Sequence, residues 1–188
     1  MFIGCLLVDE MSIREAYHFD RRSMKILGFT DLGSHTPDDQ KSKLGNHALV
    51  LMYQPYQGTW IQPIACFLSR GAASSDVLCQ IIMEAIILME NAGFRVNNIT
   101  TDGATWNRSM WSKFGITDGN VSCEHIVDEG RRLWFVSDFP HLIKNVRNWM
   151  TGKHLPSKVY MPMKFLKKFR LKCKNVPISD FFLHFYIF

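Results

Sequence analysis

Residues 75–102 read SDVLCQIIMEAIILMENAGFRVNNITTD, and this stretch decides the fold. Its first part is typical of one apolar face of an α-helix, because apolar pairs recur at positions 77/78, 81/82, 85/86 and 88/89. Gly93 is typical of a helix C-terminus. Val96–Thr101 then predicts a strand that ends at Asp102. A helix followed directly by a strand is the building unit of an α/β sheet.

Two other continuous apolar runs also end at an aspartate. Phe2–Val8 predicts a strand buried on both faces and is followed by Asp9. Leu133–Ser137 predicts a second strand of the buried type and is followed by Asp138. The sequence therefore predicts three strands that each present an acidic residue at the carboxyl end.

A hairpin is predicted between the first strand and the helix. His47–Gln54 and Thr59–Phe67 are strand-like and flank a Pro-Tyr-Gln-Gly turn at 55–58. Pro63 cannot donate a backbone hydrogen bond, so its strand is expected at a sheet edge or at a bulge.

Weaker patterns fill the rest of the chain. Residues 11–17 predict a short turn or helix, 25–30 a weak strand and 34–45 a polar surface loop. Residues 104–114 predict a helix, and Pro140 predicts the first turn of another that ends at Gly152. The resulting fold class is α/β, a mixed sheet with flanking helices.

Composition restricts the class of protein. A chain of 188 residues with 47% apolar and 21% charged residues is long enough for one domain with a full core. The longest apolar candidate, Val77–Met89, is shorter than the roughly 20 residues that a membrane span needs. The five cysteines are scattered and form no CxxC, which argues against a disulfide framework or structural zinc. We predict a soluble intracellular protein without membrane contact.

Charge is distributed unevenly. Residues 1–140 hold 12 Lys or Arg against 16 Asp or Glu, whereas residues 141–188 hold 10 against 1. Such asymmetry indicates contact with nucleic acid or another polyanion, although a solvated basic face remains an alternative. Six basic residues interleaved with apolar ones are the candidate DNA contacts: Lys164, Lys167, Lys168, Arg170, Lys172 and Lys174. A basic amphipathic helix against a partner or an anionic membrane is the other interpretation.

The strand-end aspartates are the candidate chemical site. In open α/β sheets ligands collect at the carboxyl ends of strands, so Asp9, Asp102 and Asp138 can converge. Paired carboxylates repel each other, and Mg²⁺ or Mn²⁺ relieves that repulsion. A single strand-end Asp is also typical of turns and helix caps, and Asp138 before Pro140 fits that alternative best. His141 is a weaker candidate for a catalytic base. Phosphate-loop, dinucleotide, nucleophile-elbow and HExxH motifs are absent from the sequence.

Four segments in order resemble the P element transposase family, which includes relatives with a THAP-type zinc finger. They are Asp9-Glu-Met-Ser-Ile-Arg-Glu15, Gly28-Phe-Thr-Asp-Leu-Gly33, Ile99-Thr-Thr-Asp-Gly-Ala104 and Asp138-Phe-Pro-His-Leu-Ile-Lys-Asn145. The resemblance implies a ribonuclease-H-like catalytic domain that cuts and joins DNA strands with Mg²⁺ or Mn²⁺ as cofactor. It also implies that Asp9 and Asp102 are the first two catalytic, metal-binding acids.

The sequence departs from that family's pattern in its last part. The third acid of the family, a Glu beyond a GTP-binding insertion, has no counterpart here, because Asp180 is the only acid after Asp138. We therefore expect residues 1–150 to form a ribonuclease-H-like domain that is incomplete at its C-terminus. Residues 151–188 would be a basic and apolar tail at the start of a truncated insertion, without the GTP site.

Two functions remain open from the sequence. The first is a catalytic-domain fragment of a metal-dependent DNA transposase, inactive at this length. The second is a non-catalytic relic that binds DNA, a transposase subunit or another copy of itself. An unstable gene fragment is a third interpretation. Nuclear localisation follows from the inferred DNA substrate.

Overall fold

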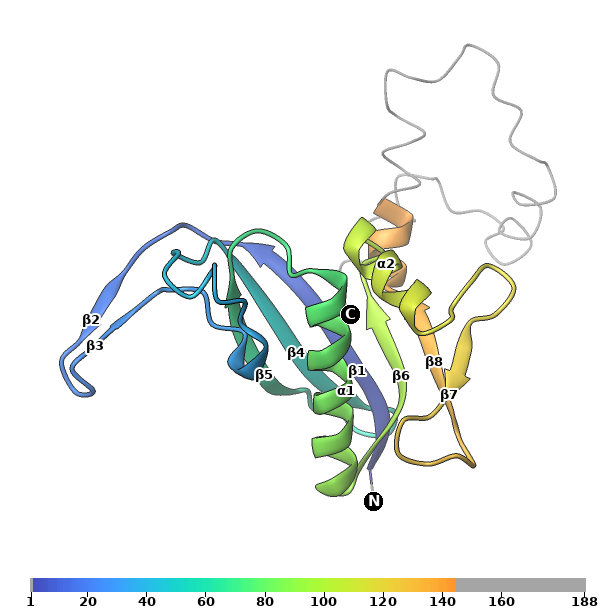
Figure 1. Ribbon diagram of the computed structural model, residues 1–188. Helices are drawn as coiled ribbons and strands as arrows, with labels where there is room; N and C mark the ends of the chain where they lie inside the picture. Colours follow the sequence, from blue (N-terminus) through green and yellow to red (C-terminus); the bar gives the residue numbers. More distant parts are fainter. Residues whose placement is uncertain (1, 145–188) are drawn as a thin grey trace, which may run out of the picture. The chain divides into compact units, whose positions relative to one another are not determined.

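A computed structural model of the chain describes residues 2–144, and these residues build a mixed six-stranded sheet with helices packed on it (Figure 1). Met1–Asp138 form one compact unit, and residues 139–144 are helical and belong to a second. The strand order is β5-β4-β1-β6-β8-β7. The elements are β1 (Phe2–Ser12), β2 (His18–Asp20), β3 (Lys25–Leu27), η1 (Gly33–His35), β4 (His47–Pro55), β5 (Gln62–Ser69), α1 (Ser75–Asn91), β6 (Phe94–Thr101), α2 (Thr105–Lys113), β7 (Ser122–Glu124) and β8 (Arg132–Ser137).

The sheet is mixed because its two halves are connected differently. β4 runs antiparallel to both β1 and β5, as the predicted hairpin requires. β1, β6 and β8 are mutually parallel neighbours, and each crossover between them carries a helix. The prediction of a mixed α/β sheet is confirmed. β5 is an edge strand with a register shift opposite Pro63, which confirms the expectation from that proline.

Helix α1 supplies the core on one face of the sheet. The Ser74 hydroxyl caps its first turn by accepting the Val77 N–H, and the chain turns away at Gly93, whose φ is +86°. Leu78, Ile82 and Ile86 are at most 1% exposed, and they pack in one cluster with residues of all the central strands and α2. The predicted helix is thus confirmed at both ends.

The expectation that the first strand and the strand before Asp138 are buried on both faces is wrong. In β1 Leu6 and Val8 are buried, but Ile3, on the opposite face, is 40% exposed. In β8 Trp134 and Val136 are 47% and 44% exposed. Helices α1 and α2 pack on the same face of the sheet. Ile3, Trp134 and Val136 on the other face therefore stay open to solvent, although Cys5 on that face is buried.

The segment after β1 also differs from its prediction. Residues 13–17 form neither a turn nor a helix, since β1 continues to Ser12 and the next element is β2. β2 pairs with β3 in a separate two-stranded sheet. The short strand β7 was not predicted either. The expected helix from Pro140 is present over 139–144, and its end lies outside the described residues, as does the expected boundary at residue 150. No helix in residues 2–144 is long and apolar enough to cross a membrane.

The side chain of Glu90, only 8% exposed, connects α1 to β6 and to the segment before β8. Its Oε1 accepts the Val96 N–H at 2.8 Å, and its Oε2 accepts Arg131 Nη2 at 2.6 Å. Arg131 Nε also donates to Asp128 Oδ2 at 2.7 Å. Buried His125 donates from Nε2 to the Val96 carbonyl at 2.9 Å and lies 3.3 Å from Glu90 Oε1, so three chain segments meet at one carboxylate.

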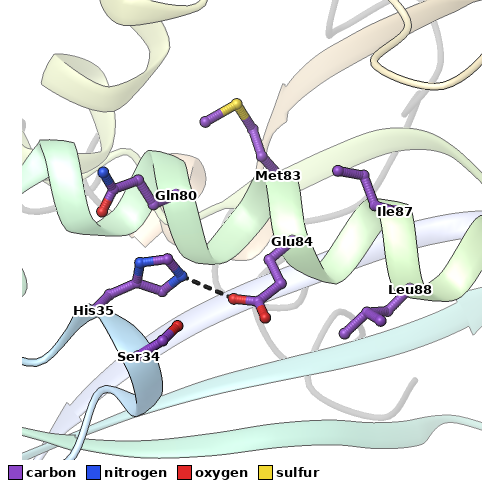
Figure 2. Close-up of a pocket in the computed structure, with 7 residues that line it drawn as sticks. All are labelled: Ser34, His35, Gln80, Met83, Glu84, Ile87 and Leu88. Atoms are coloured by element: carbon purple, nitrogen blue, oxygen red, sulfur yellow. Dashed lines mark hydrogen bonds and ion pairs between the residues drawn. The ribbon is translucent and has the colours of Figure 1, made fainter.

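Replacing this carboxylate should destabilise the fold strongly. We expect Glu90→Ala to lower the free energy of unfolding by about 3 kcal/mol, because Arg131, only 16% exposed, loses one of its two carboxylate partners and the Val96 N–H loses its acceptor. The matched control is Glu84→Ala on the same helix, whose carboxylate is 54% exposed and contacts His35 at 2.8 Å (Figure 2). Its cost should stay below about 1 kcal/mol. Urea denaturation measures both, and equal costs would contradict this role for Glu90.

Candidate functional site

The pairing of the three parallel strands brings the predicted aspartates to one edge of the sheet. Val8 pairs with Thr101, so Asp9 and Asp102 are the next residues on neighbouring strands. Thr101 in turn pairs with Ser137, and the Asp138 N–H donates to the Thr101 carbonyl at 2.7 Å. Neighbouring strands lie about 4.8 Å apart, so the three acids are side by side at the carboxyl edge. The register therefore aligns the three residues along one edge of the sheet, and their role as a common site stays a prediction.

Asp102 is held by the turn that leads into α2. Its Oδ1 accepts the Ala104 N–H at 2.8 Å and Asn107 Nδ2 at 2.7 Å. Asn107 is buried, and Gly103 between the strand and the helix has a φ of +75°. Oδ1 therefore performs the turn-stabilising role that a strand-end Asp often has. Oδ2 accepts no hydrogen bond from the residues that the structure describes and is available to a ligand.

The side chains of Asp9 and Glu10 lie in different surroundings. Asp9 is exposed, and its Oδ1 accepts only the N–H of the next residue, at 2.9 Å. Glu10 is half-buried, and its Oε1 accepts Ser69 Oγ and the Ala73 N–H, each at 3.3 Å. Burial raises the pKa of the Glu10 carboxyl, and the negative charge of Asp102 adds to the rise. Glu10 is therefore close enough to Asp102 to belong to the same acidic edge.

The donor set suits a small hard cation. Asp9, Glu10 and Asp102 have no Lys or Arg ion-pair partner within residues 2–144, so their charges are not neutralised there by the protein. Mg²⁺ is commonly bound through one or two carboxylates and keeps several waters. The free oxygens of Asp9 and Asp102 fit such an ion. In the described part of the chain no three His, Cys, Asp or Glu side chains are grouped to hold a metal. Residues 2–144 therefore offer two carboxylate ligands here, Asp9 and Asp102.

The other candidate residues and the groove found in the structure do not belong to this edge. The basic residues Lys164 to Lys174 lie outside the described residues, and His141 lies in the second unit. A groove between η1 and α1 is lined by Ser34, His35, Gln80, Met83, Glu84, Ile87 and Leu88 (Figure 2). It contains none of the predicted site residues. The contact between His35 and Glu84 in this groove holds η1 against α1 and is structural.

Comparison with known proteins agrees with the fold. A family model described as "TNP-like, RNase H N-terminal domain" matches residues 1–115. The chain is 26% identical over 145 residues to the Transposable element P transposase of Drosophila melanogaster, which covers 77% of this chain and 17% of that protein. It is 25% identical over 147 residues to the human DNA transposase THAP9, covering 76% and 16%.

A solved structure shares the fold. The Drosophila P element transposase strand transfer complex matches with a TM-score of 0.62 at 22% identity, over 94% of this chain and 36% of that chain. The sheet and the family match over residues 1–115 thus define an RNase H-like domain, as the sequence predicted. The chain belongs to the P element transposase and THAP9 family, through the TNP-like RNase H N-terminal domain. It spans about a sixth of the length of these two relatives.

Two residues at this edge were missed as site residues. Neither Glu10 nor Asn107 was predicted as a site residue. The spacing of Asp102 and Asn107, with a helix starting between them, is the one sequence signal that could have indicated their contact. The contacts of Glu10 with Ser69 and Ala73 join positions about sixty residues apart and leave no local signal.

The environment of Glu10 predicts a pH effect on stability. Because its pKa is raised in the folded protein, the charged form is disfavoured there, and stability is lost as pH rises through the folded pKa. Glu10→Gln removes this loss. The free energy of unfolding of the variant relative to the wild type should therefore rise between about pH 4 and pH 7. Denaturation at several pH values measures it, with Glu129→Gln in an exposed loop as the control for charge. A difference that is independent of pH would contradict this environment for Glu10.

Proposed function

We propose that this chain supplies the first two metal-binding acids of a DNA strand-cleaving and strand-transferring catalytic domain. The observation that carries the proposal is the parallel register, which sets Asp9 and Asp102 side by side at the carboxyl edge with one free oxygen each. The relatives named above are described as transposases, and the solved relative as a strand transfer complex. The substrate would then be a DNA phosphodiester.

The roles of the residues follow from their surroundings. Asp9 and Asp102 would hold Mg²⁺ or Mn²⁺, which when bound activates a water or a 3′-hydroxyl and stabilises the leaving oxygen. Asn107 is a positioning residue, because its amide fixes Oδ1 of Asp102 and thereby directs Oδ2 outward. Glu10, held by Ser69 and Ala73, adds negative charge that strengthens cation binding. A third acid from outside residues 2–144 would complete the ligand set.

The test is cation binding by the chain and its variants. We expect Asp9→Asn and Asp102→Asn each to weaken Mn²⁺ binding at least about tenfold, because each removes one of two anionic ligands. Calorimetry at pH 7 measures the affinity, and Glu84→Gln on α1 is the matched control for an exposed carboxylate remote from the edge. Within the complete protein the two Asn variants should lose metal-dependent nicking of DNA. Unchanged Mn²⁺ affinity and nicking in both variants would refute the proposal.

A second function is favoured by the charge distribution. The excess of basic residues in 141–188 fits a chain that binds DNA without cleaving it. Nuclear localisation and contact with a transposase subunit or a second copy belong to the same proposal.

The basic segment can be tested separately from the metal site. Deleting residues 158–188 should weaken binding of duplex DNA and flatten its salt dependence, because Lys164, Lys167, Lys168, Arg170, Lys172 and Lys174 are removed. Fluorescence anisotropy over a range of salt concentrations measures both effects. Binding that is unchanged in affinity and in salt slope would exclude these residues as DNA contacts.

A further inference from the structure

A two-stranded arm projects from the carboxyl end of β1 (Figure 1). We define the arm as residues 14–28, which contain β2 and β3. Its base is fixed to the body by backbone bonds from Ile13 N to Asn46 O at 2.8 Å and from Gly45 N to Gly28 O at 2.9 Å. Where its two limbs meet, Gly28 has a φ of +110°, and a Cβ there would lie 2.1 Å from the Ala16 carbonyl oxygen. The arm is thus an ordered part of the fold, and it starts a few residues beyond Asp9.

The tip of the arm has a fixed shape and carries unpaired cations. The Asp20 carboxylate accepts the N–H groups of Arg22 and Ser23 and the Ser23 hydroxyl, which closes the turn. Arg21, Arg22 and Lys25 are exposed and have no ion-pair partner within the described residues. A tip that is already ordered lowers the entropic cost of binding.

The charge of the arm is opposite to that of the body. Residues 14–28 hold four Lys or Arg and two Asp or Glu, whereas the rest of residues 1–140 holds eight against fourteen. One of the two acids of the arm, Glu15, is already paired with Arg70 of the body at 2.6 Å. The other, Asp20, is engaged within the tip. The net positive charge is therefore presented at the far end.

The arm also exposes apolar side chains on a ribbon too short to be stable alone. Three residue pairs join β2 to β3, and Phe19 and Ile26, which face each other in the register, are 47% and 56% exposed. Isolated two-stranded hairpins are marginal in water. Such a ribbon gains from a partner that contacts its apolar side chains and neutralises its tip.

We infer that the arm is a duplex DNA clamp: Arg21, Arg22 and Lys25 contact phosphates while the ribbon lies in a groove beside the acidic edge. The inference rests on the proposed function, because it takes DNA as the ligand of that edge. A two-stranded β-ribbon fits the major groove of B-DNA, where apolar side chains can contact thymine methyl groups. Duplex DNA satisfies both the cationic tip and the apolar ribbon. β1 carries Asp9 and ends at Ser12, shortly before the arm begins at residue 14, so DNA held by the arm passes near the acidic edge.

The experiment measures binding of the full chain to a 30-base-pair duplex in EDTA, where no metal contributes. The triple variant Arg21→Gln/Arg22→Gln/Lys25→Gln should lower affinity at about 0.1 M salt at least about tenfold, and reduce the slope of log affinity against log salt by about 2–3. The matched control is Lys41→Gln/Lys43→Gln, because these exposed lysines already pair with Asp38 and Asp39. The control should keep the wild-type slope.

Three outcomes would overturn the inference. They are no DNA binding by the wild-type chain, an unchanged slope in the triple variant, and a dimer that Phe19→Ser/Ile26→Ser converts to monomer with DNA affinity unchanged. The last outcome would make the arm a contact between copies. The clamp is measured by DNA binding in EDTA, where no metal is bound, and the metal site by Mn²⁺ binding without DNA. A failed metal site and a failed clamp therefore give different results.

Discussion

The pairing of β1 with β6 is the constraint on which the candidate site depends. Both strands alternate between a core face and an open face, so a slip of one residue would turn Leu6 and Val8 away from α1. The same slip would move Asp9 out of line with Asp102. Burial of two aliphatic side chains under α1 therefore fixes the geometry of two carboxylates that are not themselves buried together. The site is positioned by the core.

Asp102 shows how one residue can serve the fold and a ligand at once. Its Oδ1 stabilises the turn into α2 through Ala104 and Asn107, and this bonding immobilises the carboxylate. A ligand that binds Oδ2 therefore meets a group whose conformational entropy has already been lost. The turn-capping interpretation and the metal-ligand interpretation, which the sequence left as alternatives, are compatible at this residue.

The sequence predicted what local periodicity controls and missed what distant segments decide. The helix over residues 75–91 and the hairpin of β4 and β5 were predictable because their period, caps and Pro63 are local signals. The position of Asp102 just after β6 was predictable for the same reason, whereas β1 continues past Asp9 to Ser12. Whether Trp134 is covered depends on which face of the sheet the helices occupy. A run of apolar residues does not indicate that face. In the arm, β3 matches the weak strand predicted over residues 25–30, but β2 and its pairing were missed because the alternation is short and the apolar side chains face no core.

Electrostatics gives a reason why the positively charged arm lies close to the acidic edge along the chain. An edge with Asp9, Glu10 and Asp102 repels DNA, whose phosphates carry the same sign of charge. A bound cation can turn this repulsion into attraction only locally, because salt screens its charge beyond about 8–10 Å. Attraction at longer range needs cations that stand away from the carboxylates and are not cancelled by them. Arg21, Arg22 and Lys25 meet both conditions, since they lie on a projecting ribbon and have no acidic partner in residues 2–144 beyond the engaged Asp20. The separation of the two charges is therefore what allows an acidic site to receive an anionic substrate.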